Sequence, residues 1–214
     1  MKGRLMLFMY KKYLKRAIDI ILSLFAIIIL AVPMGIAAVI IKLDSPGPVF
    51  FKQKRIGIHK TTFNIIKFRS MPVTAPHDTP THQLKNAESM LSGWQKFIRK
   101  TSIDELPQIY NIFLGQMSII GPRPALWNQY DLIAERDKYD ANDIKPGLTG
   151  WAQINGRDEL EIDEKARLDG EYASKISFSF DCLCFFKTIT SVLRHDGVVE
   201  GGACEKEHAK TSKG

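Results

Sequence analysis

The feature that most constrains this chain is an apolar run close to its N-terminus. Residues 17–41 read AIDIILSLFAIIILAVPMGIAAVII, and Asp19 is their only formal charge. About 20 apolar residues suffice for a helix to cross the hydrocarbon core of a bilayer. A cleaved signal peptide fits poorly, because the run is longer than a typical signal core and no small-X-small site precedes a mature domain. The run therefore predicts a membrane-embedded helix.

Two details of the run favour a re-entrant hairpin over a straight span. Pro33 lies in its middle with Gly35 close behind, and proline removes a backbone donor and kinks a helix. Both flanks are basic, with Lys11, Lys12, Lys15 and Arg16 before the run and Lys42, Lys52, Lys54 and Arg55 after it. Because basic flanks stay in the cytoplasm, a helix broken at Pro33 that enters and leaves on one face satisfies both. An ordinary span with a tolerated proline is the alternative.

Charge and cysteine content narrow the class of protein only a little. The net charge of +7 suggests nucleic acid, an anionic lipid or a phosphorylated substrate as a partner, without choosing among them. The cysteines are Cys182, Cys184 and Cys204, and the Cys-X-Cys pair has no second pair to complete a zinc site. A disulfide framework does not fit this pattern, so we expect buried, inert thiols in a reducing compartment.

The remaining sequence predicts an α+β, mostly helical fold. Residues 49–56 and 62–68 are rich in β-branched and aromatic side chains and predict a hairpin with its turn at 57–60. Helices are expected over 86–100, 102–116, 126–139, 158–173 and 177–193, and loops over 72–83 and 145–157. We thus expect a re-entrant membrane helix hairpin (1–46), a cytoplasmic catalytic domain with a short β-hairpin and interfacial amphipathic helices (47–196), and a disordered tail (197–214).

The residues best suited to chemistry are the adjacent acids Asp104 and Glu105. Ser102 and Glu105 have the spacing of a capping box, which predicts that the acids open a helix. Backbone N–H groups there favour an ionised aspartate, which can act as nucleophile or metal ligand. Arg99 and Arg123 could clamp phosphate oxygens. Acids in a first helical turn are also common for stability alone, so the pattern leaves catalysis and capping both open.

Other candidate groups carry weaker signals. The basic residues of the hairpin, which are Lys52, Lys54, Arg55, Lys67 and Arg69, form either a solvated face or a strip facing lipid headgroups or nucleotide phosphates. His77 and His82 lie in a proline-rich loop and are expected to be solvated. The glycine-rich segment 147–157 lacks the spacing of a Walker loop, so we expect a structural turn.

Five stretches together resemble the bacterial sugar transferases that begin glycoconjugate assembly, the small monotopic phosphoglycosyl transferases. They span residues 15–157 in the family's order and read KRAIDIILSLFAIIILAVP, SPGPVFFKQKRIG, FNIIKFRSM, RKTSIDELPQIYNIFLGQMSIIGPRP and KPGLTGWAQINGR. The apolar segment near residue 185 also fits. Each stretch alone is unspecific, whereas their ordered combination is highly specific.

The resemblance implies a transferase of phosphorus-containing groups in the bacterial inner membrane. A UDP-sugar would give its sugar 1-phosphate to a polyprenyl phosphate, with release of UMP. Asp104 matches the family's nucleophile, which forms a covalent phosphosugar intermediate, and Glu105 matches the second acid, so both are expected near a Mg²⁺ cofactor. The positions matching motif residues that hold phosphates or the uridine part are Lys67, Arg69, Arg99, Arg123, Gln153 and Arg157.

One departure and several open points accompany the resemblance. The family member compared most closely has a Ser-Pro pair at the membrane break, where this chain has Val32-Pro33. The sugar is not readable, although an N-acetylated hexose is our expectation, and the oligomeric state is open, a homodimer included. Besides UDP-sugar, polyprenyl phosphate and membrane lipids we expect no nucleic-acid partner. A membrane-anchored scaffold or lipid-binding protein, and a membrane-bound phosphatase or nucleotidase, are the alternatives.

Overall fold

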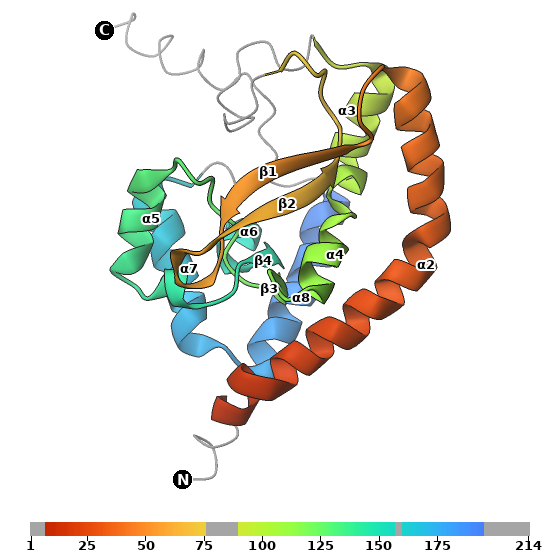
Figure 1. Cartoon of the computed structure of the whole chain (residues 1–214). Helices are drawn as coiled ribbons and strands as arrows, with labels where there is room; N and C mark the ends of the chain where they lie inside the picture. The colour runs from red at the N-terminus through yellow and green to blue at the C-terminus, as the bar shows by residue number, and fades with distance from the viewer. Residues whose placement is uncertain (1–6, 76–89, 157–159, 195–214) are drawn as a thin grey trace, which may run out of the picture.

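The structure is a computed structural model that describes residues 7–75, 90–156 and 160–194. Within these ranges the fold is α+β and mostly helical (Figure 1). In chain order the elements are η1 (Tyr10–Leu14), α2 (Lys15–Asp44), β1 (Phe50–Ile56), η2 (Ile58–Lys60), β2 (Thr62–Phe68), α3 (Gly93–Lys100), η5 (Ile103–Glu105), α4 (Gln108–Phe113), β3 (Ser118–Ile120), α5 (Tyr130–Asp137), η6 (Ala141–Asp143), β4 (Gly147–Thr149), α6 (Trp151–Ile154), α7 (Ile162–Lys175) and α8 (Phe178–Arg194). The predictions for His77, His82, Arg157, Cys204 and the tail 197–214 lie outside the described residues.

The apolar run forms most of α2, a single helix of 30 residues with Pro33 inside it. With the residues before it, this helix is long and apolar enough to cross a membrane, with a mean hydropathy of 2.9. Figure 1 shows a bend part-way along α2. Proline removes one hydrogen bond and crowds the preceding turn, which kinks a helix without ending it. Where the sequence predicts a re-entrant hairpin, the structure therefore shows one continuous helix with a bend.

The C-terminal half of α2 has one buried side and one exposed side. Met34, Ala37 and Ile41 are buried in a core cluster with Phe68 of β2, Ile98 of α3 and Ile109 of α4. The opposite side exposes large apolar residues, including Val32 at 71%, Val39 at 59% and Leu43 at 82%. The helix therefore contributes to the protein core and also presents an apolar surface outward.

The N-terminal half of α2 is fastened by polar contacts that its apolar composition does not suggest. Asp19, the only charge in the run, is buried and accepts hydrogen bonds from Ser118 Oγ (3.1 Å) and the Ile119 N–H (3.0 Å). Arg16 donates to two carbonyl oxygens at the end of α4, on residues 112 (2.6 Å) and 113 (2.7 Å). These contacts join α2 to the following domain, so its charges here are structural.

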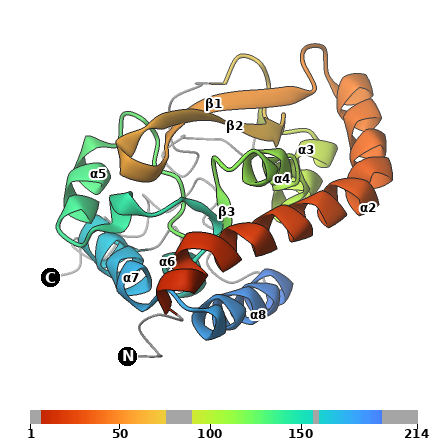
Figure 2. The ribbon, with the colours of Figure 1, turned by 60° about the horizontal axis from the view of Figure 1, so that its bottom comes forward.

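A second polar junction joins α2 to α7 and α8. The Asp181 carboxylate accepts hydrogen bonds from the Tyr10 hydroxyl, the Lys15 ammonium and the Tyr172 hydroxyl, each at 2.6 Å. We call these four residues the α2–α8 junction. Figure 2 shows α8 beside the first half of α2. Asp181, which interrupts the apolar pattern of α8, therefore faces inward, and Cys184 is buried near it as a free thiol.

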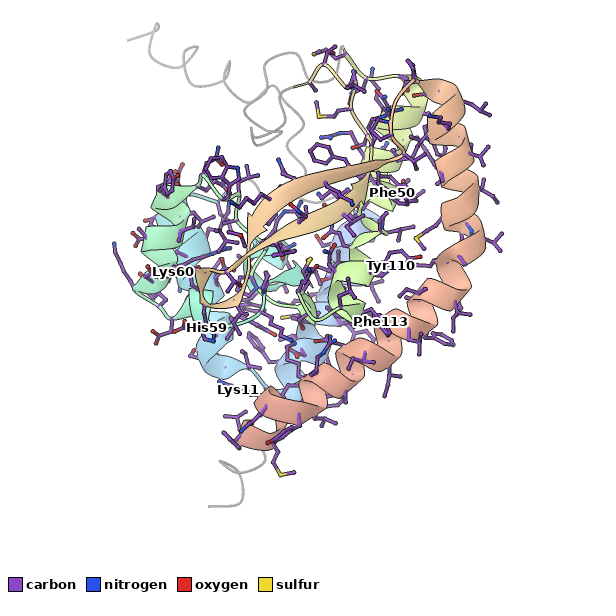
Figure 3. All side chains as sticks on the ribbon, in the orientation of Figure 1. Lys11, Phe50, His59, Lys60, Tyr110 and Phe113 are labelled. Carbon is purple, nitrogen blue, oxygen red and sulfur yellow. The ribbon has the colours of Figure 1, made fainter. Side chains whose placement is uncertain are left out.

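The predicted hairpin is confirmed, and its tip is fastened to the rest of the domain. β1 pairs antiparallel with β2, with Ile56 opposite Thr62. His59 and Lys60, labelled at the tip in Figure 3, adopt positive φ angles of 51° and 58°. His59 contacts the Asp143 carboxylate in η6 at 3.0 Å, and Lys60 contacts the Asp137 carboxylate at the end of α5 at 3.0 Å. These exposed contacts add little stability, and they join the tip of the hairpin to α5 and η6.

The prediction of a loop over 145–157 is wrong. Within it, β4 pairs parallel with β3, and α6 follows. A strand of three residues has too few positions to show a period, and its partner is distant in sequence, so the local pattern gave no signal. Glycine is required here, because a Cβ on Gly121 would lie 2.4 Å from a carbonyl oxygen at residue 145, and a Cβ on Gly150 would lie 2.0 Å from the Gly121 carbonyl oxygen.

Two predicted helices begin later than expected. Of the helix predicted over 86–100, residues 86–89 lie outside the described residues; residues 91 and 92 are not helical, and α3 begins at Gly93 after a capping box in which Ser92 and Gln95 bond each other's backbone N–H groups. In place of 126–139, α5 covers Tyr130–Asp137, because Leu126 pairs with Arg55 in an isolated β-bridge. The helix propensity of the residues favoured a helix at both places, but contacts with distant parts of the chain decided where each helix begins.

Candidate active site

The acids 104 and 105 are positioned by a buried asparagine in the next helix. Asn111 of α4 is fully buried; its Oδ1 accepts from the Ile66 N–H (3.0 Å) and its Nδ2 donates to the Asn64 carbonyl (2.8 Å). An amide that pairs with strand backbone in both directions fixes α4 against β2. The turn η5 before α4 therefore lies beside the end of β2, and Asp104 and Glu105 meet Lys67 and the residues that follow that strand.

The capping box predicted at Ser102 is wrong. Ser102 has a left-handed backbone conformation (φ 56°, ψ 20°) and its side chain makes no capping hydrogen bond. Residues 103–105 form a 3₁₀ turn, and the Glu105 carboxylate points to cations from other elements instead of the Ser102 N–H. A left-handed non-glycine residue costs on the order of 1 kcal/mol, and such strain concentrates at functional sites.

Glu105 is held by two cations. Its Oε1 accepts from Lys67 Nζ (2.8 Å) and from Arg123 Nη2 (2.9 Å). Burial would raise the pKa of the Glu105 carboxyl, but the charges and hydrogen bonds of Arg123 and Lys67 outweigh it and hold the pKa well below its usual range. Glu105 is therefore ionised at neutral pH and serves to orient the two cations.

Asp104, the neighbouring acid, has a different environment. It is buried, and its Oδ2 accepts one hydrogen bond, from the Ser70 hydroxyl at 3.1 Å. Burial raises the pKa of the Asp104 carboxyl to about 6, a rise that the nearby charge of Lys67 opposes and that of Glu105 reinforces. Arg99 lies near enough for its charge to favour the ionised form as well. The result is a carboxylate that is mostly ionised at neutral pH yet weakly solvated, which suits a nucleophile.

Lys67 connects the two acids. Burial lowers the pKa of its ammonium, with the positive charge of Arg123 acting in the same direction, while Glu105 and Asp104 favour the charged form. Its side chain is 15% exposed and its Nζ bonds Glu105. An ammonium that bonds Glu105 and lies near enough to Asp104 for their charges to interact is well placed to donate to a phosphate oxygen of a ligand that arrives at Asp104.

Sequence reasoning missed two residues of this site. Ser70, the hydrogen-bond donor to Asp104, follows the second strand motif and carried no charge signal. Arg55 was grouped with the whole basic strip, but it donates to the Pro124 carbonyl at 3.0 Å and supports the turn that carries Arg123. Burial and the Arg123 guanidinium lower the pKa of Arg55, although a guanidinium still stays protonated at neutral pH. The alternation of side chains between the two faces of a strand could have identified Arg55, because it places Arg55 on the same face as Lys67.

Strand alternation also divides the basic strip into two faces. Arg55 and Lys67 lie on the face toward the two acids, whereas Lys54 lies on the other, with its ammonium 5.8 Å from the Trp127 ring centroid. Successive strand residues point to opposite faces of a sheet, so five basic residues in a short hairpin cannot form one patch. The solvated-face interpretation therefore holds for part of the strip only.

The remaining predicted ligands are not all brought to the acids. Arg69 donates from its guanidinium to the Ser45 carbonyl (2.6 Å) and the Pro46 carbonyl (2.9 Å) just after α2, which gives it a structural task. Gln153 in α6 donates to the Leu148 carbonyl (3.1 Å) and approaches Gly150. Arg157 lies outside the described residues.

The two acids suit a magnesium ion only if a ligand helps to hold it. Among the residues that the structure describes, no three His, Cys, Asp or Glu side chains gather in a metal-binding group. Mg²⁺ in proteins is often bound by one or two carboxylates together with substrate phosphates and water. Within the described residues, Ser70 uses one oxygen of Asp104 and the cations use one oxygen of Glu105, so the second oxygen of each carboxylate could bind such an ion.

Comparison with known proteins shows the family of this chain. The model of the bacterial sugar transferase family matches residues 10–195, a range that contains every element of the site. The chain belongs to the bacterial sugar transferase family. It is 37% identical over 185 residues to the uncharacterized sugar transferase EpsL of Bacillus subtilis, which covers 86% of this chain and 90% of the relative.

Longer relatives of this sugar transferase have named activities. It is 38% identical over 186 residues to the UDP-glucose:undecaprenyl-phosphate glucose-1-phosphate transferase of Escherichia coli, covering 83% of this chain and 40% of the relative. It is 37% identical over 188 residues to the UDP-N-acetylgalactosamine-undecaprenyl-phosphate N-acetylgalactosaminephosphotransferase of Aeromonas hydrophila, covering 85% of this chain and 44% of that relative. The chain thus spans less than half of these two proteins, whose names differ in the sugar.

Proposed function

We propose that this transferase moves a sugar 1-phosphate from a UDP-sugar to undecaprenyl or another polyprenyl phosphate and releases UMP. The observation that carries the proposal is the asymmetry of the adjacent acids: among the described residues, Glu105 bonds two cations, while Asp104 accepts from one neutral donor. The names of the relatives from Escherichia coli and Aeromonas hydrophila supply the substrate classes. An N-acetylated hexose on UDP is our proposal for the donor.

The reaction proceeds in two balanced steps. First, an oxygen of the Asp104 carboxylate attacks the β-phosphorus of the UDP-sugar; a phosphorus–oxygen bond forms, the bond to the bridging oxygen breaks, and UMP leaves with that oxygen. Second, an oxygen of the polyprenyl phosphate attacks the same phosphorus, and the bond to Asp104 breaks. The carboxylate is restored, and the product is a polyprenyl diphosphate sugar. A raised pKa keeps the carboxylate nucleophilic, and burial limits attack by water.

The cations around the acids would neutralise the diphosphate as it approaches. Lys67 and Arg123, oriented by Glu105, lie beside the attacking carboxylate, and the charge of Arg99 also reaches Asp104. Charge development during phosphoryl transfer is spread over oxygens that such groups contact. A bound Mg²⁺, held by Asp104 and Glu105 with the substrate, would supply further charge neutralisation.

The apolar surfaces support a place at the cytoplasmic face of the bacterial inner membrane. α2 exposes large apolar side chains, and α8 exposes Phe178, Phe185 and Phe186. Figure 3 shows Tyr110 and Phe113 extending from α4 on the side of α2, and both are more than a third exposed. We propose that the bent α2 enters and leaves on one face of the bilayer, which would bring the headgroup of a lipid substrate to Asp104.

The test is UMP release from a panel of UDP-sugars by the full chain in detergent or nanodiscs, with and without undecaprenyl phosphate and Mg²⁺. We expect sustained release with one or a few donors only when the lipid phosphate is present. Without acceptor, intact-mass spectrometry should show one phosphosugar on the protein, on the peptide that contains Asp104. Asp143→Asn, a matched change at an exposed aspartate, should keep both signals.

Two results would contradict the proposal. Release of UMP and free sugar phosphate without any lipid would indicate a phosphatase or nucleotidase. Complete inactivity with every donor, combined with binding to anionic vesicles that weakens with salt, would indicate a non-enzymatic membrane scaffold.

A further inference from the structure

The turn that carries Arg123 is held by the Gly121 N–H, which donates to the Thr149 carbonyl at 2.8 Å, and by a series of its carbonyl oxygens. Residues 121–124 read Gly-Pro-Arg-Pro, and each proline lacks an N–H donor. Four successive carbonyls accept hydrogen bonds from other elements: Pro122 from the Gly147 N–H (2.8 Å), Arg123 from Arg136 (2.9 Å), Pro124 from Arg55 (3.0 Å) and Ala125 from the Ile56 N–H (2.9 Å). The position of the Arg123 guanidinium therefore depends on donors outside the turn.

One of these donors has a fixed orientation because it belongs to a buried ion pair. Arg136 of α5 donates from Nε (2.9 Å) and Nη2 (2.6 Å) to Oδ2 of Asp169 in α7. The same Nη2 donates to the Arg123 carbonyl at 2.9 Å. The side chains of Arg136 and Asp169 are 5% and 1% exposed. A guanidinium held on one side by a buried carboxylate presents its remaining donors in one geometry.

We infer that Arg136, oriented by Asp169, is a positioning residue that sets Arg123 against Glu105 in the transferase reaction. The inference rests on the proposed function. It gives α5 and α7, which contribute no side chain to the acids, a part in the reaction through one chain of contacts from Asp169 to Glu105. Groups that act on a reacting centre through another residue typically change rates by about 10- to 100-fold when altered.

The test is a double-mutant cycle on kcat/KM for UMP release, with Asp169→Asn, Arg123→Ala and the double variant. We expect Asp169→Asn alone to lower kcat/KM about 10- to 100-fold. In the Arg123→Ala background the same change should cost no more than about threefold, because the residue through which it acts is gone. Arg136→Lys, which keeps the charge but loses the fork of donors, should behave like Asp169→Asn.

A matched control separates positioning from general destabilisation. Asp181→Asn also removes a buried charge partner, but at the α2–α8 junction, where it does not touch the 121–124 turn. Its effect on kcat/KM should be the same in the wild-type and Arg123→Ala backgrounds. Full additivity of Asp169→Asn with Arg123→Ala would overturn the inference.

A second readout does not need turnover. The ¹⁵N signals of the Arg123 guanidinium, recorded in the full chain, should move toward those of a solvated arginine in Asp169→Asn, because Arg123 would leave its place beside Glu105. An unchanged Arg123 signal would refute the inference even if no UDP-sugar were turned over. Inactivity of the wild type together with the shifted Arg123 signal would contradict the proposed function and leave the positioning role standing.

Discussion

Two buried aspartates in this molecule have opposite surroundings. At the α2–α8 junction, Asp181 accepts three hydrogen bonds at 2.6 Å, one of them from an ammonium. In the candidate site, the part of the chain that the structure describes gives Asp104 one hydrogen bond at 3.1 Å, from a neutral hydroxyl. The first carboxylate is neutralised by its partners and joins three helices. The second has room and reactivity left for a ligand, so burial alone does not tell a structural acid from a reactive one.

The largest expected effect comes from making the same isosteric change at both aspartates. Asp104→Asn should lower the rate of UMP release by about 10³-fold or more, because the attacking oxygen is lost. The folded state raises the pKa of Asp104 to about 6, so the charge opposes folding at neutral pH. Thermal unfolding should therefore show an unchanged or higher melting temperature, with a gain of up to about 3 kcal/mol.

Loss of both activity and stability in Asp104→Asn would show that the carboxylate is structural, like Asp181. Turnover at the wild-type rate would remove Asp104 from the mechanism altogether.

Asp181→Asn should have the reverse effect. Lys15 would lose its buried counter-ion, and breaking such a pair costs about 3 kcal/mol. Denaturant unfolding in detergent should report this loss, while turnover below the melting temperature should stay within a few-fold of the wild type. A variant as stable as the wild type would mean that the α2–α8 junction does not contribute the stability that its hydrogen bonds indicate.

Glu105→Gln should affect both properties, because this acid shares features of each region. It is paired with cations like Asp181 but lies next to Asp104. Removing its charge leaves Lys67 and Arg123 without their common acceptor, so we expect UMP release to fall about 10²-fold. Its depressed pKa contributes stability that is present above about pH 4.5 and lost in more acid solution. The variant should therefore be less stable at pH 7, and the difference should shrink in acid.

The smallest expected effect is the pH dependence of the wild type. Because the reactive form of Asp104 is the carboxylate, kcat/KM should be level above about pH 6.5 and fall about tenfold per pH unit below about pH 6. Ser70→Ala removes a hydrogen bond that favours the charged form, so it should move this limb to higher pH. A profile that is flat between pH 5 and 7 in both proteins would argue against a raised pKa at Asp104.

The parts of the fold with a regular local pattern could be predicted from the sequence. The apolar run gave α2, and the two β-branched segments gave the hairpin with its turn at 57–60. The sheet of β3 and β4 could not be predicted, because each strand has three residues and the partners lie almost thirty residues apart. The sequence sign of this sheet was its glycines, which let two distant backbone segments approach each other closely, and no rule about local sequence describes such an approach.

The charged residues of the site could be predicted from the sequence, but the contacts of their side chains could not. Asp104, Glu105, Lys67 and Arg123 carry charge in recognisable motifs, and the structure brings them together. Ser70 carries no such signal, and the Ser-X-X-Glu spacing pointed to a cap that does not form. The guanidinium of Arg69 bonds the Ser45 carbonyl at the end of α2, a contact that its motif did not indicate. Side-chain direction depends on packing between elements, which single-sequence reasoning does not contain.

The polar ties of α2 have a consequence for the order in which the chain is made. α2 precedes all of its partners in the sequence: Arg16 bonds a carbonyl 96 residues later, Asp19 a hydroxyl 99 residues later, and Lys15 a carboxylate 166 residues later. During synthesis the apolar helix is therefore complete while these three charges still lack their acceptors and donors. Chain segments that emerge a hundred residues apart must then meet, so α8, the last of the described helices, completes the attachment of α2.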